Sequence, residues 1–208
     1  EANARLCIDH IREELSSETL DVMYKKIFGK DKVFIHAHFG TNDIEDIFSK
    51  LRYLIVGCDC KWVVVDHLHM LVTALSENDE RRGIDNIMTR LRSMVEETGA
   101  GIILVSHLRR VDGNKGHENG IQVNLSHLRG SNSIAQLSDC VIALERNQQS
   151  DDERESRTTR LRVLKSRYTG DVGLASSLLY DKDSGRLTEF DETDFSSIDD
   201  EFEPDIPF

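Results

Sequence analysis

One aspartate and three histidines stand where their side chains could bind a metal ion or another charged ligand. The apolar run VVV, residues 63–65, is typical of a buried strand and ends on Asp66, which His67 and His69 follow closely. A second apolar run leads to His107. A carboxylate at the end of an apolar strand costs free energy to desolvate, so Asp66 needs a metal ion, a basic side chain or backbone donors as a partner.

The aspartate favours a hard cation over a transition metal. Magnesium prefers oxygen ligands, and a strand end can aim a carboxylate at a bound phosphate, although a helix cap or a loop ion pair would also explain Asp66. An extended chain would place His67 and His69 on the face opposite Asp66, and Leu68 on the shared face cannot be a ligand. We therefore expect magnesium here and no metal site made of imidazoles.

Two groups of basic residues could bind phosphates. Lys165 and Arg167 alternate with other residues along a strand pattern, so we expect both on one face, where two like charges need an anion between them; a solvated strand face is the alternative. The long connection 108–127 contains Arg109, Arg110 and Lys115 together with three glycines. A connection of this length in a compact domain tends to be functional or disordered.

Helical and strand patterns alternate along most of the chain, and this predicts an α/β fold. We expect a mainly parallel, twisted sheet flanked by helices, with antiparallel strands towards the C-terminus. Ligands of such folds bind at the carboxyl ends of the strands, where Asp66 and His107 both fall. The predicted helices are 3–28 with a break near Ser16, 42–57, 82–98 and a short one within 128–139. The predicted strands are 32–39, 61–66, 101–107, 140–146, 159–168 and 175–180.

The net charge of -12 is concentrated at the C-terminus. Nine acidic residues and no Lys or Arg lie within 189–208, which leaves 29 acidic against 26 basic residues before that point. Both prolines and four of the eight phenylalanines fall in the same segment. We predict a domain over 1–188 and a disordered acidic tail over 189–208, which either docks on a basic, partly apolar surface or only aids solubility.

Other features of the sequence exclude whole classes of protein. No apolar stretch approaches the length of a membrane span and no signal peptide pattern is present, so we expect a cytoplasmic protein. The four cysteines lack the paired spacing of a zinc site, and we expect reduced thiols.

Four segments in a fixed order carry a resemblance to a known family. After Asp66 come ILVSHLRR (103–110), LRGSNSIAQLSD (128–139), VIALERNQQ (141–149) and LKSRYTGD (164–171). Together they resemble the RecA-like hexameric replicative DNA helicases, in particular the group of T-odd phage primase-helicases and mitochondrial replicative helicases. The resemblance covers about residues 30–188 and implies a phage protein in a bacterial host.

The resemblance implies a role for each matching residue in the nucleotide site. Asp66 would be the aspartate that holds Mg²⁺, and His107 the sensor of the γ-phosphate of ATP or dTTP. Gln136 would link the state of the nucleotide to DNA. Arg167 would be an arginine finger that acts in the neighbouring subunit's site, with Lys165 beside it. Arg146 and Tyr180 sit where the family clasps the adenine.

The resemblance also implies binding of single-stranded DNA. Arg109, Arg110 and Lys115 would line the channel of a six-membered ring, and Arg129 would add a phosphate contact. A second channel loop would be TALSENDERR (73–82), although a Ser76 helix cap explains that segment equally well.

Some family features are missing from this sequence. It contains no G-x-x-x-x-G-K-[ST] phosphate loop, and we identify no glutamate that would activate water. We therefore expect a truncated helicase domain that does not hydrolyse ATP alone. A RecA-type recombinase and a non-catalytic DNA-binding module are the alternatives. The family's acidic tails suggest a replicative DNA polymerase as a partner, with Phe208 as the anchor.

Overall fold

The computed structural model describes residues 16–29, 33–36, 43–72, 77–110 and 116–190, and the chain divides into two compact units. The first, called here the α/β unit, comprises Leu15–Arg110 and Leu125–Asp139. The second, the antiparallel unit, comprises Glu1–Glu14, Val111–Asn124 and Cys140–Phe208. Within the described ranges, no helix is both long and apolar enough to cross a membrane.

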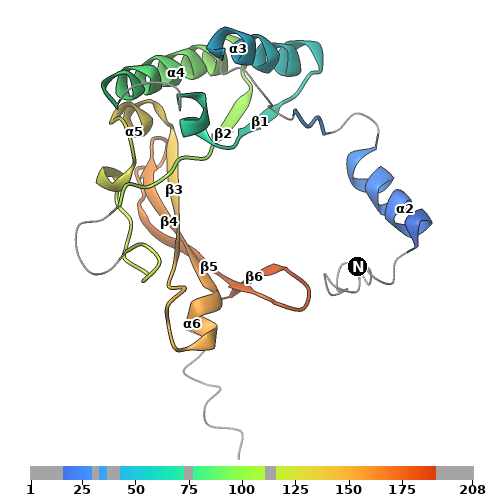
Figure 1. Cartoon of the computed structure of the whole chain (residues 1–208), viewed down its shortest axis with the longest axis vertical. Coiled ribbons are helices and arrows are strands. Elements are labelled where there is room, and N and C mark those ends of the chain that lie inside the picture. Colours follow the sequence, from blue (N-terminus) through green and yellow to red (C-terminus); the bar gives the residue numbers. More distant parts are fainter. Residues whose placement is uncertain (1–15, 30–32, 37–42, 73–76, 111–115, 191–208) are drawn as a thin grey trace, which may run out of the picture. The chain divides into compact units, whose positions relative to one another are not determined.

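The α/β unit consists of helices and a short parallel sheet (Figure 1). Its α-helices are α2 (Ser17–Phe28), α3 (Ile44–Arg52), α4 (Glu77–Thr98) and α5 (Ser133–Leu137). Its other helical turns are η2 (Tyr53–Gly57), η3 (Leu68–Leu71) and η4 (Leu125–His127). The two strands are β1 (Trp62–Val65) and β2 (Gly101–Leu104), and they pair in parallel with Val65 opposite Leu104. Both strands therefore end at the same edge of the sheet.

A hydrophobic core joins α3, α4 and this sheet. Apolar residues recur along α4 every three or four positions, so they form one stripe that the core covers. The members from this helix are Ile84, Ile87, Met88, Leu91 and Met94. The other members come from α3, η2, β1, η3, α5 and the connections after η3 and α4: Phe48, Leu51, Ile55, Val63, Leu68, Val72, Ala100 and Ile134.

Helix ends follow the sequence signals in part. Ser16 caps α2, its hydroxyl accepting a hydrogen bond from the Thr19 amide at 3.2 Å, which confirms the predicted cap; the part of the predicted helix before Ser16 lies outside the described residues. Helix α4 begins at Glu77, five residues earlier than predicted, so residues 77–82 of the expected second loop are helical. Residues 73–76 of that loop lie outside the described residues.

Two details of the predicted sheet are wrong. Within the expected strand 32–39, the described residues 33–36 form no strand. The expectation that helices cover both faces of the parallel strands also fails, because Trp62, Val64 and Ile103 are 70%, 64% and 51% exposed. One face of β1 and β2 packs on the core, and the other carries apolar side chains on the surface.

The antiparallel unit contains four strands in the order β3-β4-β5-β6. They are β3 (Cys140–Arg146), β4 (Thr158–Ser166), β5 (Gly173–Tyr180) and β6 (Leu187–Phe190), with the short helix α6 (Glu153–Arg157) before β4. The antiparallel pairing of β4 and β5 confirms the period-two pattern of the sequence. Their connection turns at Gly170, whose φ of 75° favours glycine.

Strand β6 includes two residues that the charge pattern assigned to the acidic tail. Glu189 pairs with Leu178 and Phe190 with Ser177 of β5. The guanidinium of Arg154 lies over the Phe190 ring, 5.4 Å from its centroid. The side chains of Glu189 and Phe190 are thus part of the antiparallel unit, and residues 191–208 lie outside the described residues.

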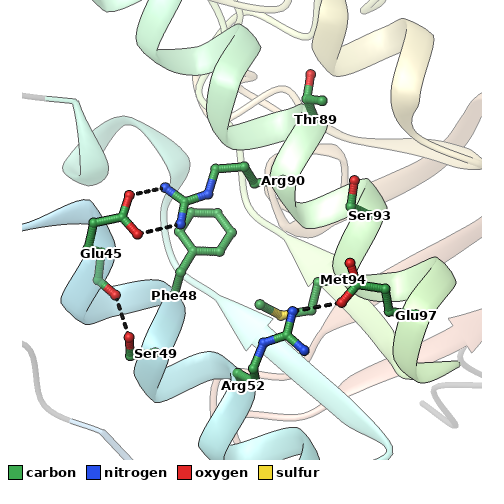
Figure 2. Close-up of a pocket in the computed structure, with 9 residues that line it drawn as sticks. All are labelled: Glu45, Phe48, Ser49, Arg52, Thr89, Arg90, Ser93, Met94 and Glu97. Atoms are coloured by element: carbon green, nitrogen blue, oxygen red, sulfur yellow. Dashed lines mark hydrogen bonds and ion pairs between the residues drawn. The ribbon is translucent and has the colours of Figure 1, made fainter.

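A shallow pocket between α3 and α4 is a structural feature of the α/β unit (Figure 2). Arg90 binds both carboxylate oxygens of Glu45, at 2.7 and 2.9 Å, and its guanidinium lies 3.9 Å from the centroid of the Phe48 ring. Arg52 pairs with Glu97 at 2.7 Å. None of the candidate site residues lines this pocket, and its charged groups link the two helices.

Candidate functional site

Asp66 follows the last residue of β1 directly, at the edge of the sheet where β2 also ends. Its side chain is exposed, and it forms no hydrogen bond or ion pair with any of the described residues. The carboxylate is thus hydrated, contrary to the desolvation expected at the end of an apolar strand, and its role as a magnesium ligand stays a prediction.

His107 lies beside Asp66 and His67 because backbone hydrogen bonds between the two chain segments continue past the ends of β1 and β2. The Val105 amide donates to the Val65 carbonyl at 3.0 Å, and the Leu68 amide donates to the Val105 carbonyl at 2.9 Å. The ring centroids of His67 and His107 lie 3.9 Å apart. Adjacent parallel strands therefore gather the predicted magnesium ligand and the predicted phosphate sensor at one edge.

The LRGS segment, residues 128–131, is attached to this edge through its backbone. The Arg129 amide donates to the His107 carbonyl at 3.1 Å, and the Arg129 carbonyl lies 3.1 Å from Nε2 of His69. Burial lowers the pKa of His69 from its ordinary value, because the protonated ring would lose its hydration. The backbone of Arg129 is thus hydrogen-bonded to both His107 and His69.

The same segment is also anchored on α4. Gly130 has φ of 104°, and a Cβ atom there would lie 2.4 Å from Cδ1 of Ile84, so both conformation and space require glycine. The Ser131 hydroxyl donates to the Asp85 carboxylate. The hydrogen bond from Ser131 lowers the pKa of Asp85. The LRGS turn is therefore held in place by contacts with the middle of α4.

The basic residues expected to bind DNA lie on the surface of the α/β unit where they are described. Arg109 and Arg110 are exposed and follow the bridge that pairs residue 108 with residue 128. Arg129 is 53% exposed and lies 3.4 Å from the Glu80 carboxylate, a weak ion pair at that distance and exposure. Gln136 is exposed on α5. Lys115 falls outside the described residues.

Arg146 and Tyr180 share one end and one face of the antiparallel sheet. Arg146 pairs with Thr159 of β4, and Thr159 pairs with Leu178 of β5, two residues before Tyr180. Side chains two apart on a strand point to the same face, so this register puts Arg146 and Tyr180 on one face. Two strand spacings and an offset of two residues, together about 12 Å, separate their backbones. The Nε atom of Arg146 donates to the Ser156 carbonyl at 2.6 Å.

Lys165 and Arg167 lie at the opposite end of that sheet. Lys165 pairs with Val141 near the start of β3. Because a strand rises about 3.4 Å per residue, the part of β4 from Thr159 to Lys165 is about 20 Å long. Strand β4 ends at Ser166, so Arg167 lies in the following turn. The prediction that the side chains of Lys165 and Arg167 project from the same face of one strand is therefore wrong for Arg167.

The second half of the long connection 108–127 is tied to β3. The buried Glu145 carboxylate accepts hydrogen bonds from the Val123 amide at 2.7 Å and from Nε of Arg162 at 2.8 Å. The Gln148 amide donates to the Glu118 carbonyl at 2.9 Å. Residues 118 and 123 of this connection are thus hydrogen-bonded to β3 and to the residues that follow it.

Sequence reasoning missed two features of these sites. It placed His67 and His69 away from Asp66 by assuming an extended chain, whereas η3 turns the chain immediately after His67. It also used Glu145 only as part of the LERNQQ motif and did not predict that its carboxylate accepts a hydrogen bond from the Val123 amide. Histidines after two neighbouring strand patterns were the available signal for the first feature. Phe208 lies outside the described residues.

Comparison with known proteins supplies the family. A family model described as the DnaB-like helicase C terminal domain matches residues 2–189. The DNA helicase/primase of Enterobacteria phage T3 is 36% identical over 180 residues, which cover 86% of this chain and 31% of that protein. The chain therefore spans about a third of the length of this curated relative.

Solved structures similar to this chain share its RecA-like α/β fold, which confirms the predicted fold class. The ATPase domain of G40P has a TM-score of 0.63 at 24% identity, over 90% of this chain and 67% of that one. A DnaB-like replicative helicase studied with primase has a TM-score of 0.58 at 23% identity, over 88% and 44%. A KaiC-like protein from Pyrococcus horikoshii has a TM-score of 0.53 at 13% identity, over 86% and 72%.

Proposed function

Because this chain belongs to the family of DnaB-like helicase C-terminal domains, we propose that it forms part of a ring-shaped replicative DNA helicase. In this proposal six copies couple the hydrolysis of ATP or dTTP to movement along single-stranded DNA and to unwinding of the duplex. The observation that carries the proposal is the separation of about 20 Å between the two groups of candidate nucleotide ligands on the antiparallel sheet.

That separation supports a nucleotide bound between subunits. Arg146 and Tyr180 share a face and could hold a base by stacking and cation-π contact. Lys165 and Arg167 lie at the other end of the same sheet, about 20 Å away along β4. One subunit would thus clasp a base with one end of this sheet and offer its finger to a different nucleotide with the other end.

The edge of the parallel sheet would supply the metal side of the nucleotide site. Asp66 fits a magnesium ligand, since its exposed carboxylate is a hard oxygen donor with no partner among the described residues. The ion would neutralise charge on the phosphate oxygens. His107 would detect the terminal phosphate, and its carbonyl is hydrogen-bonded to the Arg129 amide. Gln136 would respond to the same change from α5.

Single-stranded DNA would be held by the exposed arginines that follow this edge. Arg109 and Arg110 follow His107 after one intervening residue, and Lys115 belongs to the same connection in the sequence. Arg129, on the segment hydrogen-bonded to His107, would contact a further phosphate. Six copies of these residues around a channel would concentrate positive charge locally although the chain as a whole is acidic.

The chain alone would bind nucleotide incompletely, because its sequence contains no phosphate loop. We expect no DNA-stimulated ATPase activity from these 208 residues, and activity from a protein in which the same reading frame is extended ahead of Glu1 until it includes a phosphate loop. Arg167→Ala should abolish that activity while nucleotide binding persists. ATPase activity of the chain alone, or an active Arg167→Ala protein, would contradict the proposal.

The missing phosphate loop also keeps a second candidate function open, that of a non-catalytic RecA-fold module that binds DNA. This candidate predicts that neither protein hydrolyses ATP and that the chain alone binds single-stranded DNA in a salt-dependent manner. A RecA-type recombinase is disfavoured because the family match is to helicases.

The acidic tail would dock on a replicative DNA polymerase, with Phe208 inserted into an apolar pocket. Deletion of residues 191–208 should abolish polymerase binding and leave the antiparallel sheet intact, because β6 ends at Phe190. The matched control is Phe208→Ala, which keeps every negative charge and should weaken binding at least about tenfold if the aromatic ring is an anchor. An unchanged polymerase affinity in the deletion variant would contradict the proposal that the tail binds the polymerase.

A further inference from the structure

Three histidines meet at the carboxyl edge of the parallel sheet and form a cluster that the proposed function uses only in part. His67 follows Asp66, His69 lies in η3, and His107 comes after β2. One ring nitrogen from each of the three lies within 4.8 Å of the others. The ring centroids of His69 and His107 are 5.4 Å apart, with the rings stacked at an interplanar angle of 10°.

Two nitrogens of this cluster are buried without a hydrogen-bond partner among the described residues. They are Nδ1 of His67 and Nδ1 of His69, and the residue His69 is only 4% exposed. A buried polar atom that lacks a partner costs free energy, so a histidine retained in this state calls for a ligand.

The hydrogen bond of His69 determines which nitrogen is available. A backbone carbonyl can only accept, so the contact of 3.1 Å between Nε2 and the Arg129 carbonyl places the proton on Nε2. The Nδ1 atom therefore carries a lone pair. Histidines that bind metals usually donate their other N–H group to a carbonyl or a carboxylate in this way, and the bond fixes the tautomer and the ring orientation.

We propose that His67, His69 and His107 form a binding site for a divalent transition metal ion of the Zn²⁺ class, distinct from the magnesium position at Asp66. Imidazole nitrogens favour zinc, copper, nickel and cobalt over magnesium, which requires oxygen ligands. Three histidines with one open position are an established coordination set for zinc.

The size of the cluster suits such an ion after a small adjustment. Ligand nitrogens of a tetrahedral zinc site lie about 3.4 Å apart, as Zn–N bonds of about 2.0–2.1 Å require. The three nitrogens of the cluster, within 4.8 Å of one another, have to approach by about 1 Å. His107 is exposed and His67 is half-buried, so rotations of these two side chains can close the site while His69 stays in place.

A bound ion would join the ends of β1 and β2 and, through His69, the Arg129 carbonyl. It should therefore raise the thermal stability of the α/β unit, because a ligand that binds only the folded chain shifts the unfolding equilibrium. Magnesium at the same concentration should not produce this shift.

The test is titration of the chain with Zn²⁺ against a chromophoric chelator, together with the absorption spectrum of the Co²⁺ complex. The chain is used with Cys58→Ser and Cys60→Ser, because these two thiols lie in the same unit and could bind zinc on their own. We expect one ion per chain with a dissociation constant of about 1 μM or lower. The Co²⁺ complex should show the visible bands of a tetrahedral site without a sulfur-to-metal charge-transfer band.

Two variants decide whether the histidines are the ligands. His107→Ala, an exposed position, should weaken zinc binding at least about tenfold and remove the tetrahedral Co²⁺ bands. The matched control is His36→Ala, an exposed histidine outside the cluster, which should bind zinc as the parent does. Circular dichroism without metal establishes that both variants are folded.

Binding of much less than one ion per chain would overturn the proposal. So would an affinity that is equal in the parent and the His107→Ala variant, or an affinity that depends on His36. None of these outcomes depends on ATP hydrolysis or DNA, so a failure of the metal site is distinguishable from a failure of the proposed function.

Discussion

The buried ion pair of Glu145 and Arg162 makes the most specific stability prediction. The Glu145 side chain is 6% exposed and the Arg162 side chain 19%, and they are joined at 2.8 Å. Removing one partner of a buried pair typically costs about 3–5 kcal/mol, since the other charge is left desolvated. Water reaches Arg162 in part and the Val123 amide remains bound to the carboxylate, so we expect Arg162→Met to cost about 2–3 kcal/mol.

A double-mutant cycle separates the pair from the two side chains. Glu145→Gln keeps an acceptor for the Val123 amide and removes the charge, so it should cost about 1–2 kcal/mol. The variant with both changes buries no unpaired charge. We expect it to be about 2 kcal/mol more stable than the sum of the single effects predicts.

Urea unfolding followed by circular dichroism is the appropriate assay, because circular dichroism reports on the strands of both units. The matched control is Lys182→Met, which breaks the exposed pair with Glu153 in the same unit and should cost less than about 1 kcal/mol. Amide exchange at Val123 should accelerate in Arg162→Met. If Arg162→Met costs no more than Lys182→Met, the reasoning about burial is refuted.

Three further predictions concern the α/β unit. Ile84→Ala removes a fully buried side chain and should cost about 2–5 kcal/mol in urea unfolding, whereas Val22→Ala, at a 66% exposed position, should cost less than about 0.5 kcal/mol; equal costs would contradict the core assignment. Gly130→Ala should cost about 1–3 kcal/mol in the same assay because of its φ of 104° and the Ile84 contact, and a neutral effect would show that the turn relaxes freely. The pKa of Asp85 is lowered in the folded chain, so Asp85 contributes stability at pH values above the pKa of an unfolded aspartate, and this contribution is lost as the pH falls through the lowered pKa. Ser131→Ala should raise the pKa of Asp85, which carbon NMR of the carboxyl group measures. An unchanged pKa in this variant would exclude the hydrogen bond as the cause of the shift.

Local patterns predicted the elements of this chain well where one face of an element is buried. The stripe of α4, the cap at Ser16 and the β4–β5 hairpin all follow from short-range rules, and each was confirmed. The start of α4 was predicted too late, because the residues after Glu77 are polar and hydrophobic periodicity cannot detect a solvated first turn.

Contacts between distant segments could not be predicted in the same way. The strand expected over 32–39 rested on apolar residues alone, and residues 33–36 pair with no described strand. The histidine cluster requires the turn η3 and the parallel register of β1 and β2, neither of which periodicity specifies. The Glu145 anchor joins β3 to residue 123 through a backbone amide, which leaves no trace in the side-chain pattern.

The register of the antiparallel sheet gives a distance between candidate nucleotide ligands that the family resemblance alone does not provide. It separates the candidate base ligands from the candidate finger by about 20 Å within one chain. We propose that a complete nucleotide site requires Asp66 from one subunit and Arg167 from another. This requirement is the central claim of the proposed helicase function.

Mixing of inactive subunits tests this claim most directly. In the longer protein that includes a phosphate loop, Asp66→Asn and Arg167→Ala should each abolish DNA-stimulated ATPase activity. Equal amounts mixed at random would give intact sites at about a quarter of the subunit interfaces, so the mixture should recover up to about a quarter of the parent activity. A mixture that forms rings but remains as inactive as its components would place Asp66 and Arg167 in the same subunit's site and contradict the account.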